Sequence, residues 1–189
     1  MTLRHVLISF LVRIFNYSGE IKMQLYIGTK MINSKPMTRL EYNQFRGWEL
    51  PSDECGSDDG YLVEYLDGKP NTKRYKGYVS WSPKEQFDGA YRKTTGMNFG
   101  LALEALKGGF KVARAGWNGI GMFCIYVPGT KDITFSEGTP YADAVGSAPN
   151  QEILPHIDMY TVNSDGRRAI LPGWLASQSD MLSDDWVIV

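Results

Sequence analysis

The sequence predicts an α+β protein, with small antiparallel sheets and short helices arranged as two small modules. Short apolar and aromatic runs are separated by strong turn signals such as Asn118-Gly119, a pattern typical of antiparallel hairpins. A chain of 189 residues is long enough for one ordinary domain or two small ones. We expect an N-terminal extension with no assigned role at residues 1–23, an α+β module at 24–93 and a second α+β domain at 97–189.

The composition is that of a soluble globular protein, with 43% apolar and 22% charged residues. A net charge of −1 argues against general nucleic-acid binding, so any anion site must be local. The two cysteines, Cys55 and Cys124, lack metal-ligand spacing, which favours a reducing cytosol and predicts no zinc site. The apolar run at residues 6–12 is too short to span a bilayer, so we predict no membrane anchor. Met23 resembles a natural start, which makes residues 1–22 an upstream extension of the reading frame.

The module at 24–93 carries signals for three strands and two helices. Thr38 and Glu41 have the spacing of a capping box, which predicts a helix ending near Arg46. Ser82, Pro83 and Glu85 predict a second helix, with Ser82 as the cap and Pro83 at the first helical position. Strands are expected at residues 25–32, 61–66 and 75–81, and an acidic surface loop at 51–60.

The second domain begins with a short amphipathic helix, followed by a hairpin. Its apolar stripe falls at i, i+3, i+4 and i+7, with Asn98 as the cap and Gly108-Gly109 as the stop. The stripe consists of Phe99, Ala102, Leu103 and Leu106. We predict strands at 110–115 and 122–127 around the turn 116–119, where Asn118-Gly119 supplies positive φ angles. A long irregular excursion at 128–150 follows, then a hairpin of 153–162 with 168–171, a helix capped by Ser177 that runs to about Ser183, and an edge strand at 186–189.

Two tryptophans fall where the backbone turns. Trp117 lies in the turn 116–119 and Trp174 follows Pro172-Gly173. One interpretation is that each ring plugs the end of a small core. The other is that the rings form a platform on which a nucleobase stacks, which is worth about 1–3 kcal/mol per ring. Two such tryptophans together favour the platform.

Arg114 ends the strand that leads into Trp117 and, by alternation, shares a face with Phe110 and Val112. A guanidinium beside an aromatic ring suits a phosphate and a base, although an ordinary surface arginine is an equal alternative. Arg167 and Arg168 reach the same region only if the fold or an oligomer brings them there.

Catalytic and metal-site patterns are weak in this sequence. The best enzymatic case is a set of paired acid–base carboxylates formed by Asp180, Asp184 and Asp185. However, Asp180 fits a capping role, and the later pair fits the solvated end of a helix. An imidazole-based catalytic triad would have to use His156, and the alternative is that His156 is a hydrogen-bonded histidine in a strand. The acidic loop lacks the ligand spacing of a calcium site. We therefore predict no catalytic residues, no metal and no cofactor.

Two segments carry a resemblance to a known family. They are MNFGLALEALKGGFKVARAGWNG and LPGWLASQSDMLSDDWVIV. Both lie within residues 97–189 and closely resemble the second type of Thoeris anti-defence (Tad) proteins of bacteriophages. These proteins are sponges that sequester the cyclic ADP-ribose-type signal of host TIR-domain proteins, and some take up cyclic dinucleotides. Residues 24–93 lie outside the minimal family domain and look like a module common in phage genomes.

The resemblance implies a non-enzymatic, cyclic-nucleotide-binding protein that acts in the cytoplasm of the infected bacterial host. It also implies a homo-oligomer, a tetramer with ligand pockets between subunits. The residues expected to line such a pocket are Phe99, Arg114, Trp117, Asn118, Trp174, Ser177, Gln178, Asp180 and Met181. An enzyme that cleaves the cyclic nucleotide is the alternative, followed by a phage structural or DNA-associated protein, which the near-neutral charge disfavours.

Overall fold

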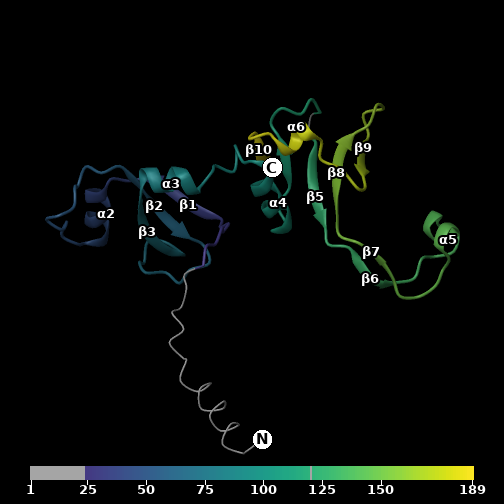
Figure 1. Cartoon of the computed structure of the whole chain (residues 1–189), viewed down its shortest axis with the longest axis horizontal. Coiled ribbons are helices and arrows are strands. Elements are labelled where there is room, and N and C mark those ends of the chain that lie inside the picture. The colour runs from purple at the N-terminus through teal and green to yellow at the C-terminus, as the bar shows by residue number, and fades with distance from the viewer. Residues whose placement is uncertain (1–23, 120) are drawn as a thin grey trace, which may run out of the picture.

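The computed structural model describes residues 24–119 and 121–189, and the expected extension at 1–23 lies outside them. Figure 1 shows a three-stranded sheet with two short helices, a five-stranded sheet with two more helices, and a projecting two-stranded ribbon. Every strand pairing is antiparallel. The predicted α+β class of small antiparallel sheets and short helices is confirmed.

The three-stranded sheet has the order β1-β2-β3 and belongs to the N-terminal half of the chain. Its strands are β1 (Ile32–Pro36), β2 (Gly60–Tyr65) and β3 (Tyr78–Pro83), and its helices are α2 (Arg39–Arg46) and α3 (Lys84–Ala90). Tyr42, Leu62 and Val79 form a buried cluster there. This half of the chain therefore has a core of its own.

Helix α2 begins and ends as its sequence signals predict. The Thr38 hydroxyl accepts from the Glu41 amide, and the Glu41 carboxylate accepts from the Thr38 amide at 2.7 Å, which completes the capping box. Gly47 ends the helix in the left-handed conformation, with φ of 72°. The predicted helix is confirmed.

Two predictions about this sheet are wrong. The strand expected at 25–32 begins only at Ile32, which pairs with Tyr65, the last residue of β2, so the preceding residues have no partner strand. The helix expected to be capped by Ser82 is capped by Pro83, without a side-chain hydrogen bond. Ser82 instead pairs with Tyr61 because the ladder of β3 extends through Pro83. In both cases the partner strand sets the boundary.

The five-stranded sheet has the order β10-β4-β5-β8-β9 and belongs to the C-terminal half. Its elements are α4 (Phe99–Lys107), β4 (Val112–Arg114), β5 (Phe123–Val127), β8 (His156–Val162), β9 (Arg168–Leu171), α6 (Gln178–Met181) and β10 (Trp186–Ile188). Asn98 caps α4 as predicted, accepting from the Leu101 amide at 3.0 Å. The positive φ expected at Asn118-Gly119 is found instead at Gly121, among the described residues of that connection, because the connection is wider than a two-residue turn.

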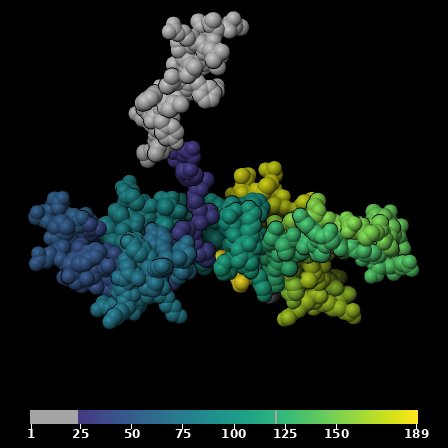
Figure 2. Space-filling view, turned by 90° about the horizontal axis from the view of Figure 1, so that it is seen from below, coloured from purple at the N-terminus to yellow at the C-terminus, as the bar shows by residue number. Residues whose placement is uncertain are grey.

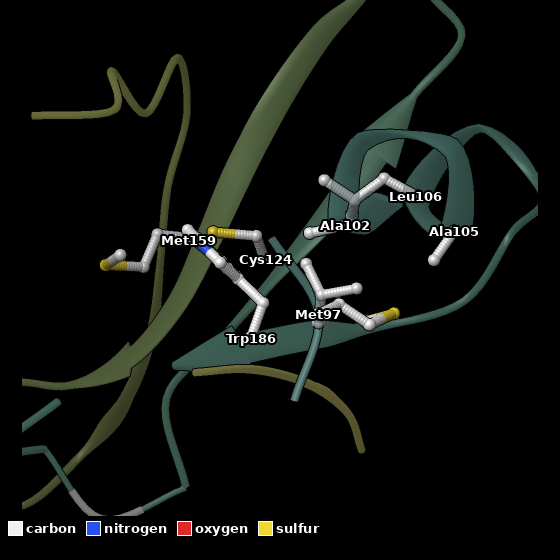
Figure 3. Close-up of a cluster of buried hydrophobic side chains, with 8 residues drawn as sticks. Met97, Ala102, Ala105, Leu106, Cys124, Met159 and Trp186 are labelled. Carbon is white, nitrogen blue, oxygen red and sulfur yellow. The ribbon is translucent and has the colours of Figure 1, made fainter. Parts of the chain in front are cut away.

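Helix α4 packs on one face of this sheet and forms the larger core. Figure 3 shows its side chains meeting those of β5, β8 and β10. The buried residues are Met97, Ala102, Ala105, Leu106, Val112, Cys124, Met159 and Trp186. Burial raises the pKa of the Cys124 thiol to about 12, so this cysteine is an unreactive core residue.

The stretch predicted to be an irregular excursion at 128–150 contains regular structure, so that prediction is wrong. It holds β6 (Thr130–Ile133) and α5 (Pro140–Val145), and β7 (Gln151–Ile153) pairs with β6. Thr139 caps α5 by accepting from the Ala142 amide, and Pro140 follows in the first turn, a local signal that the sequence contained. This ribbon continues β5 and β8 away from the sheet (Figure 1).

Among the described residues, no helix is long and apolar enough to cross a membrane.

Candidate functional site

Three tryptophans that are distant in sequence meet at the edge of the larger core. Trp117 comes from the connection after β4, Trp174 from the segment after β9, and Trp186 from β10. Their ring centroids are 5.4 to 6.1 Å apart, and each pair packs edge to face. Trp186 is fully buried, whereas Trp117 and Trp174 are half-buried. The two predicted tryptophans therefore do share one place, with a third ring beneath them.

Trp117 does not stand free of the core. It packs against the buried cluster, as does Trp174, so part of each ring plugs the domain and part faces outward. Phe99 of α4 also joins the group, with its ring centroid 5.5 Å from that of Trp186. These contacts support the plug interpretation for the buried part of each ring, and a platform for a nucleobase on the exposed part stays a prediction.

Asp180 connects the tryptophans to α6 and β4. Its carboxylate accepts hydrogen bonds from Trp117 Nε1 at 3.1 Å and Arg114 Nη1 at 3.0 Å. It also accepts from the amide and the hydroxyl of Ser177, at 3.0 and 2.6 Å, which completes a capping box at the start of α6. The capping role predicted for Asp180 is confirmed, although the helix ends at Met181 rather than near Ser183.

Arg114 is held by two carboxylates. Its Nε donates to Asp185 at 2.8 Å, in addition to the bond to Asp180, and its side chain is only 17% exposed. Asp185 also accepts from the Gly116 amide at 2.9 Å, which fixes the start of the connection that carries Trp117. The interpretation of Asp185 as a residue that solvates the end of a helix is wrong, because β10 brings it beside β4.

The hydrogen bonds of this network keep its two carboxylates and its guanidinium ionised. Burial raises the pKa of Asp180, but hydrogen bonds from Ser177, Arg114 and Trp117 outweigh it and lower the pKa to about 2. The hydrogen bond from Arg114 also lowers the pKa of Asp185. These bonds in turn raise the pKa of the Arg114 guanidinium. A carboxylate with a lowered pKa is a poor general acid at neutral pH because it is ionised, and a weak general base because it binds a proton poorly. The network therefore suits a scaffold better than proton transfer.

The remaining predicted residues lie at the surface around this cluster. Asn118 follows Trp117, while Gln178 and Met181 belong to α6, and all three are exposed. The predicted set therefore divides into a held interior and an exposed rim. The interior consists of Phe99, Arg114, Trp117, Trp174 and Asp180, and Ser177 is an exposed residue that is bonded to Asp180. Sequence reasoning missed Trp186 and the role of Asp185, and the only local signal was an aromatic residue opening the last strand.

Other candidate groups lie outside the cluster. His156 Nε2 is 3.4 Å from Asp158, and its Nδ1 is 2.8 Å from the Leu154 carbonyl oxygen, so it is a hydrogen-bonded strand histidine. In the acidic loop, Glu54 pairs with Arg39. Within the described ranges, no group of three or more His, Cys, Asp or Glu residues is placed to hold a metal ion.

Comparison with known proteins connects this arrangement to phage biology. Residues 97–189 match the family model for the Thoeris anti-defense 2-like domain. The chain is also similar to Thoeris anti-defense 2 of Bacillus phage SP01, with 33% identity over 95 residues that cover 97% of that protein and 50% of this chain. The chain belongs to the Thoeris anti-defense 2-like family. Membership of this family supports a phage anti-defence role and is consistent with a non-enzymatic one.

The family match begins at Met97, the first residue of the larger core, and includes every residue of the tryptophan cluster. Residues 24–96, with the three-stranded sheet, lie outside it. The anti-defence assignment therefore concerns the C-terminal half of the chain.

Proposed function

We propose that the protein binds and sequesters a cyclic nucleotide immune signal without cleaving it, within the cytoplasm of the infected bacterium. The proposed ligand is a cyclic ADP-ribose isomer, with cyclic dinucleotides as a second class. The proposal rests on one observation above all. Two half-buried tryptophans, Trp117 and Trp174, lie side by side at an exposed rim. The network of Arg114, Asp180 and Asp185 holds Trp117 through its bond to Asp180, and packing against Trp117 and Trp186 holds Trp174.

The fixed ring of Trp117 suits the stacking of a nucleobase. Stacking needs a flat aromatic surface that is fixed before the ligand arrives, because ordering a free side chain on binding costs free energy. The edge-to-face contacts with Trp186 and the Nε1 bond to Asp180 remove that freedom from Trp117. Asn118 and Gln178 then offer amide groups for base or ribose hydrogen bonds.

Phosphate recognition needs a further source of donors. Because two carboxylates neutralise Arg114, this guanidinium serves the scaffold rather than a phosphate in the single chain. A pocket completed by a second copy supplies the missing donors. This fits the proposed homo-oligomer, a tetramer by family resemblance, with sites between subunits and the ligand-binding domain at 97–189.

Calorimetric titration with a cyclic ADP-ribose isomer tests the binding proposal. We expect Asn118→Ala and Gln178→Ala each to weaken affinity about 5- to 30-fold, the effect of losing one ligand hydrogen bond. Both side chains are exposed, so the melting temperature should stay unchanged. Asp165→Ala, in the exposed turn between β8 and β9, is the matched control and should bind like the native chain. Equal affinity for all four proteins would exclude this rim from the ligand site.

A further inference from the structure

A projecting segment of the C-terminal half has no partner within the described chain. We call residues 128–155 the arm: it contains β6, α5 and β7, and Figures 1 and 2 show it extending from the far ends of β5 and β8. All of its residues are described, and none is buried. Several large apolar side chains are mostly exposed, with Tyr141 at 61%, Val145 at 62% and Leu154 at 68%.

Such a segment is not expected to be stable by itself. A two-stranded ribbon is marginal in water unless it packs against something else, and α5 buries no residue. The arm nevertheless has defined internal contacts: Phe135 stacks on Tyr141 with ring centroids 4.9 Å apart, and Thr139 caps α5. These contacts organise an apolar surface that a partner must cover.

A suitable receptor lies on the outer face of the five-stranded sheet. Val112 and Cys124 point into the core, so their strand neighbours Lys111 and Phe123 point to the opposite face. Phe123 stacks on Tyr160 at 4.6 Å, and Lys111 Nζ lies 4.9 Å from the centre of the Phe123 ring. With Arg168 these residues line a shallow hollow of about 600 Å³, which we call the outer hollow.

The two surfaces are complementary in charge as well as in apolar character. The arm carries Asp132, Glu137, Asp143 and Glu152 against one lysine, Lys131, and is therefore acidic. Lys111 and Arg168 make the outer hollow basic. Opposite charges around a small apolar centre are typical of specific interfaces.

The arm of a chain does not meet its own outer hollow. Phe123 and Tyr160, which line the hollow, pair with each other at one end of β5 and β8, whereas the arm leaves beyond Val127 and His156 at the other end. We propose that the arm of one copy docks in the outer hollow of a second copy of this chain. This inference deepens the proposed function, because it rests on the homo-oligomer and identifies its contact.

Charge reversal tests the docking. Light scattering across a dilution series should show an oligomer for the native chain. Lys111→Glu with Arg168→Glu, and separately Glu137→Lys with Asp143→Lys, should each weaken association at least tenfold, while combining all four should restore it to within about threefold. Lys69→Glu with Lys73→Glu, a matched change in the exposed loop after β2, should have no effect. A native monomer, unaffected reversals or failure of the combination to restore association would each overturn the docking.

Cross-linking identifies the contact and separates a partner copy from the same chain. In a mixture of ¹⁴N- and ¹⁵N-labelled protein, a zero-length carbodiimide should join Lys111 to an arm carboxylate in mixed-isotope pairs. Links confined to single-isotope pairs would mean that the arm folds back on its own chain, and would overturn the proposal. Titration of assembled protein with a cyclic ADP-ribose isomer keeps the two hypotheses apart. If the protein binds the cyclic ADP-ribose isomer and neither reversal pair affects assembly, only the docking proposal is overturned. If assembly depends on the arm but the isomer does not bind, only the proposed ligand is overturned.

Discussion

Replacing Trp186 by alanine is expected to lower the free energy of unfolding of the C-terminal domain by about 3–5 kcal/mol, the usual cost of truncating a large buried aromatic residue. Trp186 is fully buried. Its ring contacts Phe99, Trp117 and Trp174, and its Nε1 donates to the Asp180 carbonyl oxygen at 2.9 Å. Removing the ring leaves a cavity beneath both outer tryptophans, so ligand affinity should fall together with stability.

Urea denaturation followed by circular dichroism measures the effect, since it does not depend on the fluorescence of the deleted residue. The control is Trp48→Ala, because Trp48 is 54% exposed and lies outside the family domain. That variant should change the unfolding of the C-terminal domain by about 0.5 kcal/mol or less. Similar small losses for both variants would contradict the central place that we give to Trp186.

Asp180→Asn should produce the second large effect, a loss of about 2–4 kcal/mol at pH 7. The pKa of Asp180 falls from 3.8 to about 2 on folding, and each unit corresponds to about 1.4 kcal/mol. The neutral amide also leaves Arg114, with its side chain only 17% exposed, without one of its two carboxylate partners.

The lowered pKa of Asp180 also predicts in which direction stability changes with pH. A carboxylate whose folded pKa is lowered stabilises the fold above its unfolded pKa, and that contribution disappears as the pH falls through the folded value. The native protein should therefore lose stability between about pH 4 and pH 2, and Asp180→Asn should lose less over that range. Thermal melting at several pH values measures this, with the exposed Asp184→Asn as control. Parallel curves for the native chain and Asp180→Asn would contradict the network.

The features that the sequence predicts well are those with local causes. The capping boxes at Thr38 and Ser177 and the asparagine cap of α4 are formed by residues only three positions apart. The turn between β8 and β9 also has a local cause, because Asn163 and Gly166 are three positions apart. Strand ends depend instead on partner strands: the strand expected at 25–32 starts only where β2 offers a neighbour.

The features that the sequence misses depend on contacts between distant residues. Arg114 and Asp185 are 71 positions apart, and neither shows by itself that the other will neutralise it. In the arm, β6 was hidden by its irregular pairing with β7 and by Asp132, which takes a positive φ of 55° within the strand. The local turn around Trp117 favours the platform interpretation, whereas the ring that packs beneath Trp117 comes from β10, far along the chain.

The most direct test of the proposed function is recovery of the ligand. The protein is mixed with an equimolar cyclic ADP-ribose isomer and filtered, and the retained fraction is heat-denatured and analysed by mass spectrometry. The proposed sequestration predicts that the signal stays with the protein and is released intact. A linear product, or a ligand that passes entirely into the filtrate, would contradict it.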